Sequence, residues 1–206
     1  MEAPHRALEG CLPVVTPRLV LRLPSRRDVP DLKRSFRDRR TARAVGASLH
    51  PPEERRDPAR MVTRTREEYR KAAHLSLSVV ERTGDRCVGR VGLRGLDWHW
   101  RKVESLSYWI DPTRWNRGYA TEASFFLCET AFRRSRMRRV SSQALSENHA
   151  SLAVLRKLGF VEEGRERRAV VVKGKAMDMV LFGLFPEEQV ARPTIEGLWG
   201  RTPTGS

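Results

Sequence analysis

The chain has 206 residues, of which 39% are hydrophobic and 32% are charged, a composition typical of one folded domain rather than of a disordered chain. No apolar run approaches the ~20 residues that a membrane-spanning helix needs, so we expect no membrane insertion. Forty lysines and arginines against 25 acidic residues give a formal net charge of +15, which favours a phosphate-bearing cofactor, a nucleic acid or an acidic protein as partner.

Alternating apolar residues predict strands, whereas an acidic residue or a proline ahead of an apolar stripe predicts the start of a helix. The first half of the chain predicts a strand at 16–23, helices at 28–40 and 57–71, and strands at 74–81, 87–96 and 103–110. The second half predicts a helix at 118–134, a strand at 139–144, a helix at 148–158, and strands at 160–167 and 176–185. Gly159 stands where a glycine often ends a helix.

The order of these elements, β-α-α-β-β-β-α-β-α-β-β, predicts an α/β fold (α+β in some classifications) with a mixed sheet. We place an N-terminal extension at 1–15, the folded domain at 16–185, and a loosely ordered tail at 186–206, where the periodicity stops. No internal repeat is visible, so the sequence predicts a single domain.

The segment 108–123 is predicted to form a strand, a turn and the start of a helix. Pro112 has no amide hydrogen, so the strand ladder should end there. The turn then presents unpaired backbone N–H groups at a helix N-terminus, a position that favours anions. Gly118 lets a phosphate approach the backbone, while Arg114 and Arg117 add positive charge. Because the known glycine-rich phosphate patterns are absent, an ordinary structural turn is an equally good interpretation of these residues alone.

Cys11, Cys87 and Cys128 have neither paired nor metal-ligand spacing, and the start of the chain lacks the charged-then-apolar order of a secretory signal. We therefore expect reduced thiols in a cytoplasmic protein. The five histidines are scattered and form no H-x-x-x-H pair, so we expect no metal site.

An ordered set of motifs runs through the whole domain. They are TPRLVLR at 16–22, VGRVGL at 88–93, YWIDP at 108–112, WNRGYATEA at 115–123, NHAS at 148–151, KLGF at 157–160 and DMVLF at 178–182. Together, over residues 16–185, they resemble the GNAT-superfamily N-acetyltransferases, and more narrowly the RimJ/RimL-type branch that acetylates the N-termini of ribosomal proteins. The resemblance implies a mixed, mostly antiparallel sheet flanked by helices.

The resemblance also implies acetyl-CoA as co-substrate. The family's pyrophosphate loop falls on Trp115, Asn116, Arg117, Gly118, Tyr119 and Ala120. Trp115 stands where many relatives have Gln or Arg, but the loop binds through backbone amides, and Thr121 is expected to add a contact. The strand residues Tyr108, Trp109 and Ile110 are expected to hold the pantetheine arm, and an amide of this strand to stabilise the thioester oxyanion.

Two residues are expected to handle protons. Glu104 is the predicted general base, directly or through water, although many relatives carry the acid at the position of Ser105. Glu104 would point to the opposite face of the sheet unless a bulge reorients it. Much of the superfamily protonates the thiolate with a tyrosine where this chain has Leu155. The resemblance implies Ser151 instead, with Asn148 contacting pantetheine; a surface acid and a packed helix serine are the structural alternatives.

Four further residues are open to two interpretations. Trp98 and Trp100 would share a face if their loop is extended and would then wall a groove for the acceptor, whereas packing in the core or burial at an interface is the alternative. Glu122, one turn into the helix, is interpreted as structural, and His149 as a surface residue. No motif specifies the acceptor, which is either a protein N-terminus or a small-molecule amine.

Two other functions compete with acetyl transfer. A basic RNA- or ribosome-binding protein on the same fold would explain the positive charge, although solvated helix faces explain the scattered arginines equally well. A CoA-binding regulator without transfer activity would explain the missing tyrosine. A ribosome contact and a homodimer are left open as partners.

Overall fold

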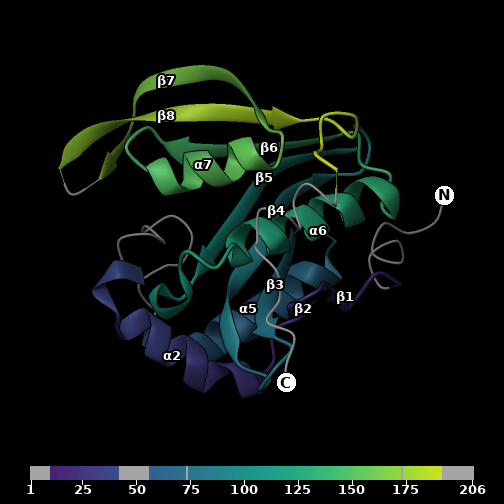
Figure 1. Cartoon of the computed structure of the whole chain (residues 1–206), viewed down its shortest axis with the longest axis vertical. Coiled ribbons are helices and arrows are strands. Elements are labelled where there is room, and N and C mark those ends of the chain that lie inside the picture. Colours follow the sequence, from purple (N-terminus) through teal and green to yellow (C-terminus); the bar gives the residue numbers. More distant parts are fainter. Residues whose placement is uncertain (1–9, 42–55, 73, 173, 192–206) are drawn as a thin grey trace.

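The computed structural model describes residues 10–41, 56–72, 74–172 and 174–191. Within them, eight strands form one sheet in the order β1-β2-β3-β4-β5-β6-β8-β7 (Figure 1). The strands are β1 (Val14–Val15), β2 (Leu19–Arg22), β3 (His74–Glu81), β4 (Cys87–Asp97), β5 (Lys102–Ile110), β6 (Arg139–Leu145), β7 (Val161–Val172) and β8 (Lys175–Leu184). The helices are η1 (Arg26–Asp28), α2 (Val29–Arg37), α5 (Pro58–Arg70), η2 (Pro112–Arg114), α6 (Tyr119–Arg133) and α7 (His149–Lys157).

The predicted order of elements is confirmed, with one strand added and one extended. The short strand β1 lies inside the predicted N-terminal extension at 1–15. The outermost strand, β7, continues to Val172 rather than ending near residue 167. Nearly all of its side chains are exposed, and its register against β8 shifts twice, so the apolar alternation that reveals other strands is missing there.

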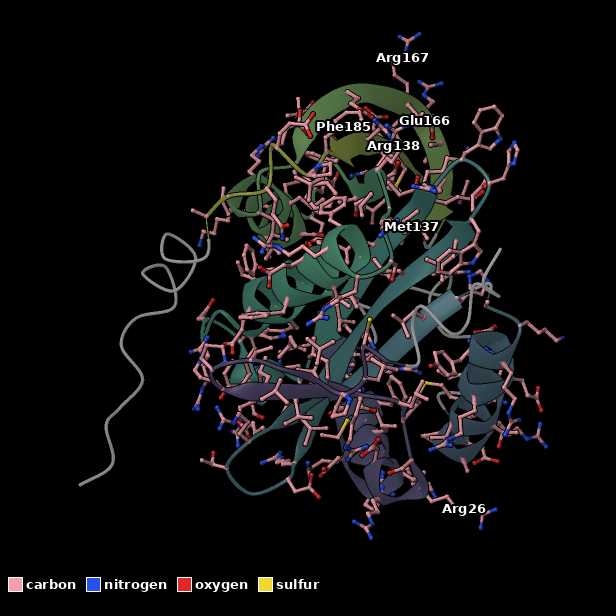
Figure 2. The ribbon with its side chains drawn as sticks, turned by 90° about the vertical axis from the view of Figure 1, so that its right-hand side faces the viewer. Arg26, Met137, Arg138, Glu166, Arg167 and Phe185 are labelled. Carbon is pink, nitrogen blue, oxygen red and sulfur yellow. The ribbon has the colours of Figure 1, made fainter. Side chains whose placement is uncertain are left out.

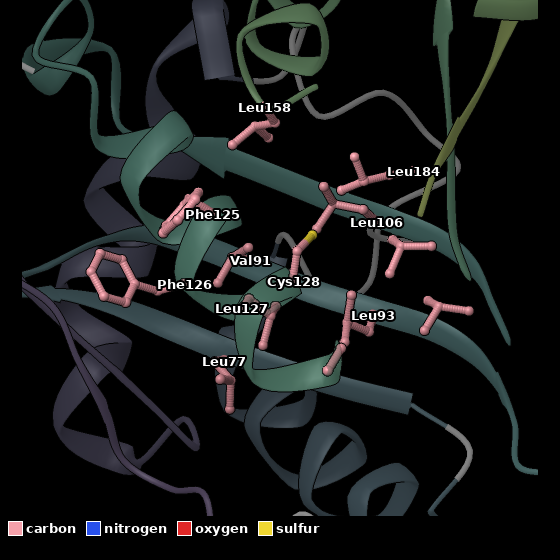
Figure 3. Close-up of a cluster of buried hydrophobic side chains, with 14 of the residues drawn as sticks. Leu77, Val91, Leu93, Leu106, Phe125, Phe126, Leu127, Cys128, Leu158 and Leu184 are labelled. Atoms are coloured by element: carbon pink, nitrogen blue, oxygen red, sulfur yellow. The ribbon is translucent and has the colours of Figure 1, made fainter. Parts of the chain in front are cut away.

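The larger core lies between the sheet and α6. This helix is buried on almost every side at its first turns, because β4 and β5 lie under it and α7 packs beside it. Figure 3 shows Leu127 and Cys128 of α6 over Leu93 of β4, and none of the three exposes more than 1% of its surface. Burial of this kind stabilises the domain by roughly 1.5–3 kcal/mol for each large side chain.

The opposite face of the sheet is covered by α2 and α5 (Figure 1). Leu32 of α2 and Met61 of α5 form a second buried cluster with Trp109 of β5, against which Phe36 also stacks at 5.2 Å between ring centroids. Side chains on the two faces of β5 therefore enter different cores, with Leu106 toward α6 and Trp109 toward α2. Packing on both faces fixes the direction of the β5 backbone.

Strand β5 diverges from β6 after only two residue pairs. The two strands are parallel and are paired only at Lys102↔Arg139 and Val103↔Val140. From there β5 continues against β4 as far as Ile110, whereas β6 continues against β8. Along most of its length, β5 therefore has a neighbouring strand on one side only within the described part of the chain.

Glu122 joins the first strands to α6. Its side chain is completely buried and accepts hydrogen bonds from Thr16 Oγ1 (2.6 Å), Arg18 N (2.9 Å) and Arg18 Nε (2.7 Å). These contacts agree with the structural interpretation of Glu122 and give the TPR sequence at the start of the domain a role in anchoring α6. They hold the first turn of α6 against the β1–β2 turn.

The start of the predicted loose tail packs against the domain. Gly159 ends α7 with φ of +96°, as predicted, and has no room for a side chain because a Cβ there would lie 2.2 Å from Glu188 O. Gln189 Nε2 donates to Phe125 O at 3.0 Å. Residues 188–190 therefore lie against the C-terminal end of α7 and the middle of α6, while residues 192–206 of the predicted tail lie outside the described residues.

Replacing Glu122 with Ala should lower the free energy of unfolding by about 3–5 kcal/mol, because the Arg18 guanidinium would lose its carboxylate in a largely buried place. Thermal unfolding measures this. Glu147→Ala, which breaks an exposed pair with Lys175, is the matched control and should leave the Tm nearly unchanged. Equal Tm values for the two variants would contradict the anchoring role.

Candidate active site

The open side of β5 is identified by the direction of its backbone groups. Asp111 N donates to Val88 O of β4 at 2.7 Å, so by the alternation of an antiparallel ladder Trp109 and Ser107 also face β4. The N–H and C=O groups of Leu106, Tyr108 and Ile110 then face the side from which β6 has departed. A buried backbone group without a hydrogen-bond partner is unfavourable, so these groups need partners other than β6.

Side chains satisfy two of the three carbonyls. Ser142 Oγ of β6 donates to Leu106 O at 3.0 Å, and Trp115 Nε1 donates to Ile110 O at 2.7 Å. Tyr108 O lies between them and accepts no hydrogen bond from the described residues. The protein thus closes the two ends of this edge and leaves its centre available to a ligand.

The chain then turns sharply into α6. Asp111 caps the turn by accepting from Thr113 N at 2.9 Å and from the Ser35 hydroxyl. Burial would raise the pKa of Asp111, but the hydrogen bonds from Ser35 and Thr113 outweigh it and hold that pKa below its ordinary value. Asn116 and Gly118 both adopt positive φ, at +59° and +73°, which is costly for residues other than glycine and asparagine.

The first turn of α6 has free amides. The first intrahelical bond runs from Glu122 N to Gly118 O, so Tyr119, Ala120 and Thr121 have no acceptor within the helix. The positive end of the helix dipole lies at the same place, and Arg117 is exposed beside it. These are the properties of an anion site.

Glu81 of β3 stabilises this turn through hydrogen bonds to two of its side chains. It accepts from Arg114 Nε at 2.8 Å and from the Tyr119 hydroxyl at 3.0 Å, while the Arg18 guanidinium lies 4.9 Å from the centre of the Tyr119 ring. Arg114 is therefore held in an ion pair, and Arg117 is the cation of this turn that remains exposed to a ligand.

Tyr108 and Ser151 meet across the open edge. The Tyr108 hydroxyl lies 3.0 Å from Ser151 Oγ and donates to Ser151 O at 3.1 Å, which joins β5 to the start of α7. Burial raises the pKa of the Tyr108 phenol well above its ordinary value, against the opposite effect of the Ser151 hydrogen bond. The phenol therefore stays protonated at neutral pH, and two hydroxyls stand beside the open backbone.

Asn148 and Leu155 complete this side of the site. Asn148 Oδ1 caps α7 by accepting from Ser151 N at 3.2 Å, which fixes the position of Ser151 and leaves the Asn148 side-chain NH₂ free to donate. Leu155 is fully buried in the main core, so the helix position that carries tyrosine in many relatives contributes only packing here. His149 is exposed, as its surface interpretation requires.

Glu104 lies on β5 but apart from this pair of hydroxyls. The ladder between β4 and β5 is interrupted at Gly95, opposite Glu104, without a shift of register. The Glu104 side chain lies across Gly95, since a Cβ there would be 2.2 Å from Glu104 Oε2. Glu104 is exposed and makes no ion pair with any described residue. Four strand positions, or about 13 Å, separate it from Tyr108.

The two tryptophans of the β4–β5 connection point in different directions. Residues 98–101 form a turn rather than an extended loop. Trp98 packs on the main core and donates from Nε1 to Ala72 O at 2.9 Å. Trp100 is 69% exposed. The two rings therefore do not form one wall of a groove.

The other reactive side chains are poor candidates for chemistry. All three cysteines are free, and burial raises the pKa of both Cys87 and Cys128 to about 12, so neither thiol ionises at neutral pH. The described residues hold no group of three or more His, Cys, Asp or Glu placed to bind a metal ion. Among these residues there is also no helix long and apolar enough to cross a membrane.

Sequence reasoning missed several residues that shape the site. The roles of Glu81, Ser142, the Trp115 indole and the Tyr108 phenol depend on contacts between residues far apart in the chain or across a turn. One signal was available: Tyr108, Trp115 and Tyr119 carry polar atoms on aromatic rings beside a predicted anion turn, and such atoms find hydrogen-bond partners when buried.

Comparison with known proteins identifies relatives along most of the domain. Residues 18–161 match the family described as acetyltransferase (GNAT) domain. YdaF of Bacillus subtilis (strain 168), provisionally named a ribosomal N-acetyltransferase, is 35% identical over 100 residues, which are 48% of this chain and 54% of YdaF. The chain thus spans about half the length of this curated relative.

Solved structures share the fold. A provisionally named ribosomal-protein-serine acetyltransferase from Vibrio cholerae has a TM-score of 0.68 at 25% identity, covering 84% of this chain and 97% of that one. RimJ from Mycobacterium smegmatis, solved in complex with CoA-disulfide, has a TM-score of 0.74 at 22% identity, covering 92% and 96%. The mixed sheet, its flanking helices and the match over residues 18–161 agree with the prediction from the motifs: this chain belongs to the GNAT acetyltransferase family.

Proposed function

We propose that this chain is an acetyl-CoA-dependent N-acetyltransferase that acts on a primary amine of a protein N-terminus or a small molecule. The observation that carries the proposal is the open side of β5, where the Tyr108 backbone lies between two carbonyls that side chains already satisfy. This edge leads to the free amides at the start of α6. An amide-bearing arm that ends in a pyrophosphate matches this succession of groups.

The phosphate end is held by the turn. Backbone N–H groups from Asn116 to Thr121 surround the position of the pyrophosphate, and the exposed Arg117 adds charge. Trp115 in the first position of the loop does not interfere, because the contacts come from the backbone. Its indole instead satisfies Ile110 O and stabilises the approach to the turn.

The reaction is a direct transfer in a ternary complex. Acetyl-CoA supplies the acetyl group as a thioester, so the amine nitrogen forms the amide bond while the carbon–sulfur bond breaks and the thiolate takes up a proton. The buried, protonated thiols of Cys87 and Cys128 are unsuited to carry an acyl intermediate. The open N–H groups of β5 stabilise the developing oxyanion.

Ser151 supplies the proton to the leaving thiolate. Its position is fixed by the Asn148 cap, and its hydroxyl is hydrogen-bonded to the Tyr108 phenol, which can in turn replace the proton. This pair takes the place of the helix tyrosine that Leu155 replaces. Asn148 also contributes its free NH₂ group to the pantetheine arm.

Glu104 accepts the proton of the amine through a chain of waters, since about 13 Å of strand separates it from Tyr108, more than one water can bridge. The demand on this base depends on the acceptor. At pH 7, deprotonating an α-amino group with a pKa of ~7.7–8 costs about 1 kcal/mol, whereas a lysine with a pKa of ~10.4 costs about 4.6 kcal/mol. A distant, exposed carboxylate is adequate for the first, so we favour an α-amino acceptor.

We do not assign the acceptor groove to Trp98 and Trp100. Trp98 is engaged with the core. Trp100 lies before β5, whose first residue, Lys102, is already six strand positions or about 20 Å from Tyr108.

Gly118→Trp should abolish acetyl-CoA binding, because the side chain would occupy the approach of the phosphates to the backbone. Calorimetric titration with acetyl-CoA measures this. Gly84→Trp is the matched control: Gly84 also has positive φ (+90°), but it has open space around it and lies in the β3–β4 turn. Unchanged affinity in the Gly118 variant would place the pyrophosphate elsewhere.

Ser151→Ala should lower kcat by about 10²-fold without changing the acetyl-CoA Kd, because it removes the proton donor. If Tyr108 acts through Ser151, Tyr108→Phe should lower kcat less, and the double variant should resemble Ser151→Ala rather than the product of the two effects. Thiol release with N-terminal peptides measures these rates, with Ser141→Ala as control. Wild-type kcat in Ser151→Ala would exclude this assignment.

Glu104→Gln should lower kcat on the order of 10²-fold and remove the acidic limb of the pH–rate profile, because the base can no longer ionise. The acetyl-CoA Kd should not change. Glu166→Gln, an exposed glutamate on β7, is the control. A pH–rate profile identical to wild type would eliminate Glu104 as the base.

A further inference from the structure

The sheet has a second distinctive end, opposite the phosphate turn. Here the β4–β5 turn lies beside the α6–β6 loop, because β5 and β6 begin as a parallel pair at Lys102↔Arg139. Arg138 N donates to Arg101 O at 2.6 Å, which ties the two connections together. Residues that are more than 30 positions apart in the chain therefore form one surface.

This surface is strongly basic. We call its exposed cations the basic end; they are Arg101, Lys102, Arg134, Arg136 and Arg138. None of the five makes an ion pair with another described residue, whereas the flanking Arg133 and Arg139 are paired with Glu129 and Glu163. Five unpaired like charges repel one another, so the arrangement is favourable mainly when an anion is bound.

The backbone at the basic end is also unusual. Arg101 and Arg136 both have φ of +53°, a left-handed conformation that has a lower energy for glycine or asparagine than for arginine. Both connections therefore carry an arginine at a position where the backbone disfavours it. Each turn therefore accepts a small conformational cost at an arginine, as the turns at Ala72 and Asp85 do at other residues.

An exposed aromatic ring stands next to these cations. Trp100 is 69% exposed and has an edge-to-face contact with His99, with ring centroids 4.8 Å apart. The turn that carries it is held, since Trp100 N donates to Asp97 Oδ1 at 2.9 Å and the turn is closed by Asp97↔Lys102. A large aromatic surface is thus presented to solvent beside five cations.

We propose that the basic end binds single-stranded RNA, at a place separate from the acetyl-CoA site. Arginines and lysines neutralise the phosphates, and an exposed aromatic ring stacks on an unpaired base, the combination that single-strand binding surfaces use. An acidic protein would match the charge but leave Trp100 without a role. A duplex would present no free base face to the ring.

The basic end is independent of the proposed acetyl-CoA site. Strand β5 separates the two, with Lys102 at one end and Ile110 at the other, so nine residues or roughly 30 Å lie between them. RNA binding should therefore persist at saturating acetyl-CoA. Loss of either activity can be measured without the other.

The test is fluorescence anisotropy of a labelled 15-nucleotide oligouridylate with the full chain, over a range of salt concentrations. The triple variant Arg134→Gln/Arg136→Gln/Arg138→Gln should bind on the order of 10–100-fold more weakly at 0.1 M salt. Its log K against log[salt] slope should fall by about 2, as expected for three lost phosphate contacts.

The matched control removes three exposed cations from another surface, as Arg26→Gln/Arg27→Gln/Lys33→Gln on η1 and α2. Figure 2 shows Arg26 and Arg138 at opposite ends of the molecule. This variant has the same net charge as the first and should keep the wild-type slope. Equal loss in both triple variants would mean that net charge alone attracts the RNA, and it would overturn the proposal.

Trp100 gives a second, charge-neutral test. Trp100→Ala should weaken oligouridylate binding by about 5–100-fold through lost base stacking, and Trp100→Phe should restore part of it. Unchanged affinity in Trp100→Ala, or displacement of the oligouridylate by decaglutamate as effectively as by unlabelled RNA, would overturn the proposal in favour of an acidic protein partner. An RNA duplex that competes as well as the single strand would overturn it too.

Discussion

Strand β5 has hydrogen-bonding partners along one side and loses them on the other, and the site follows from this constraint. Buried backbone groups need partners, so a strand that leaves its neighbour after two residue pairs must find substitutes. Ser142 and the Trp115 indole supply them at the two ends. Between them, no group of the described residues donates to the Tyr108 carbonyl. We take that unmet requirement as the place where the amide-bearing arm of acetyl-CoA is bound, because its groups complete the edge as another strand would.

The remainder of the structure keeps that edge aligned with the anion turn. Buried Glu122 ties α6 to the first strands, and Glu81 ties Arg114 and Tyr119 to β3. The start of α6 is thereby fixed relative to the end of β5, so the free amides of its first turn follow directly on the open backbone. On the other side, the contact between Tyr108 and Ser151 fixes α7. Three carboxylate or hydroxyl contacts, each between residues far apart in the chain, thus orient one continuous binding edge.

Local patterns in the sequence predicted local structure well. The alternation at His74–Glu81 and the glycine that ends α7 were predicted at the positions where they occur, since each depends on a few neighbouring residues. The two-residue β1 was missed, because pairing with β2 rather than its own pattern defines it. Within the site, the motifs predicted the anion turn. They could not predict that the Tyr108 hydroxyl contacts Ser151 or that Arg114 forms an ion pair with Glu81. Such contacts depend on how far two elements lie apart in space. The basic end could be predicted only in part: Arg134, Arg136 and Arg138 are close in the sequence, but Arg101 and Lys102 join them only where two distant connections meet.

Hydrogen exchange of individual amides, followed by NMR with and without saturating acetyl-CoA, tests the central claim most directly. Ser107 and Tyr108 are neighbours whose amides face opposite sides of β5, toward β4 and toward the open edge respectively. Acetyl-CoA is expected to slow exchange at the Tyr108 amide strongly and to leave the Ser107 amide, already bonded to β4, nearly unchanged. Equal exchange rates at Tyr108 in the free and the saturated protein would contradict the claim that acetyl-CoA completes this edge.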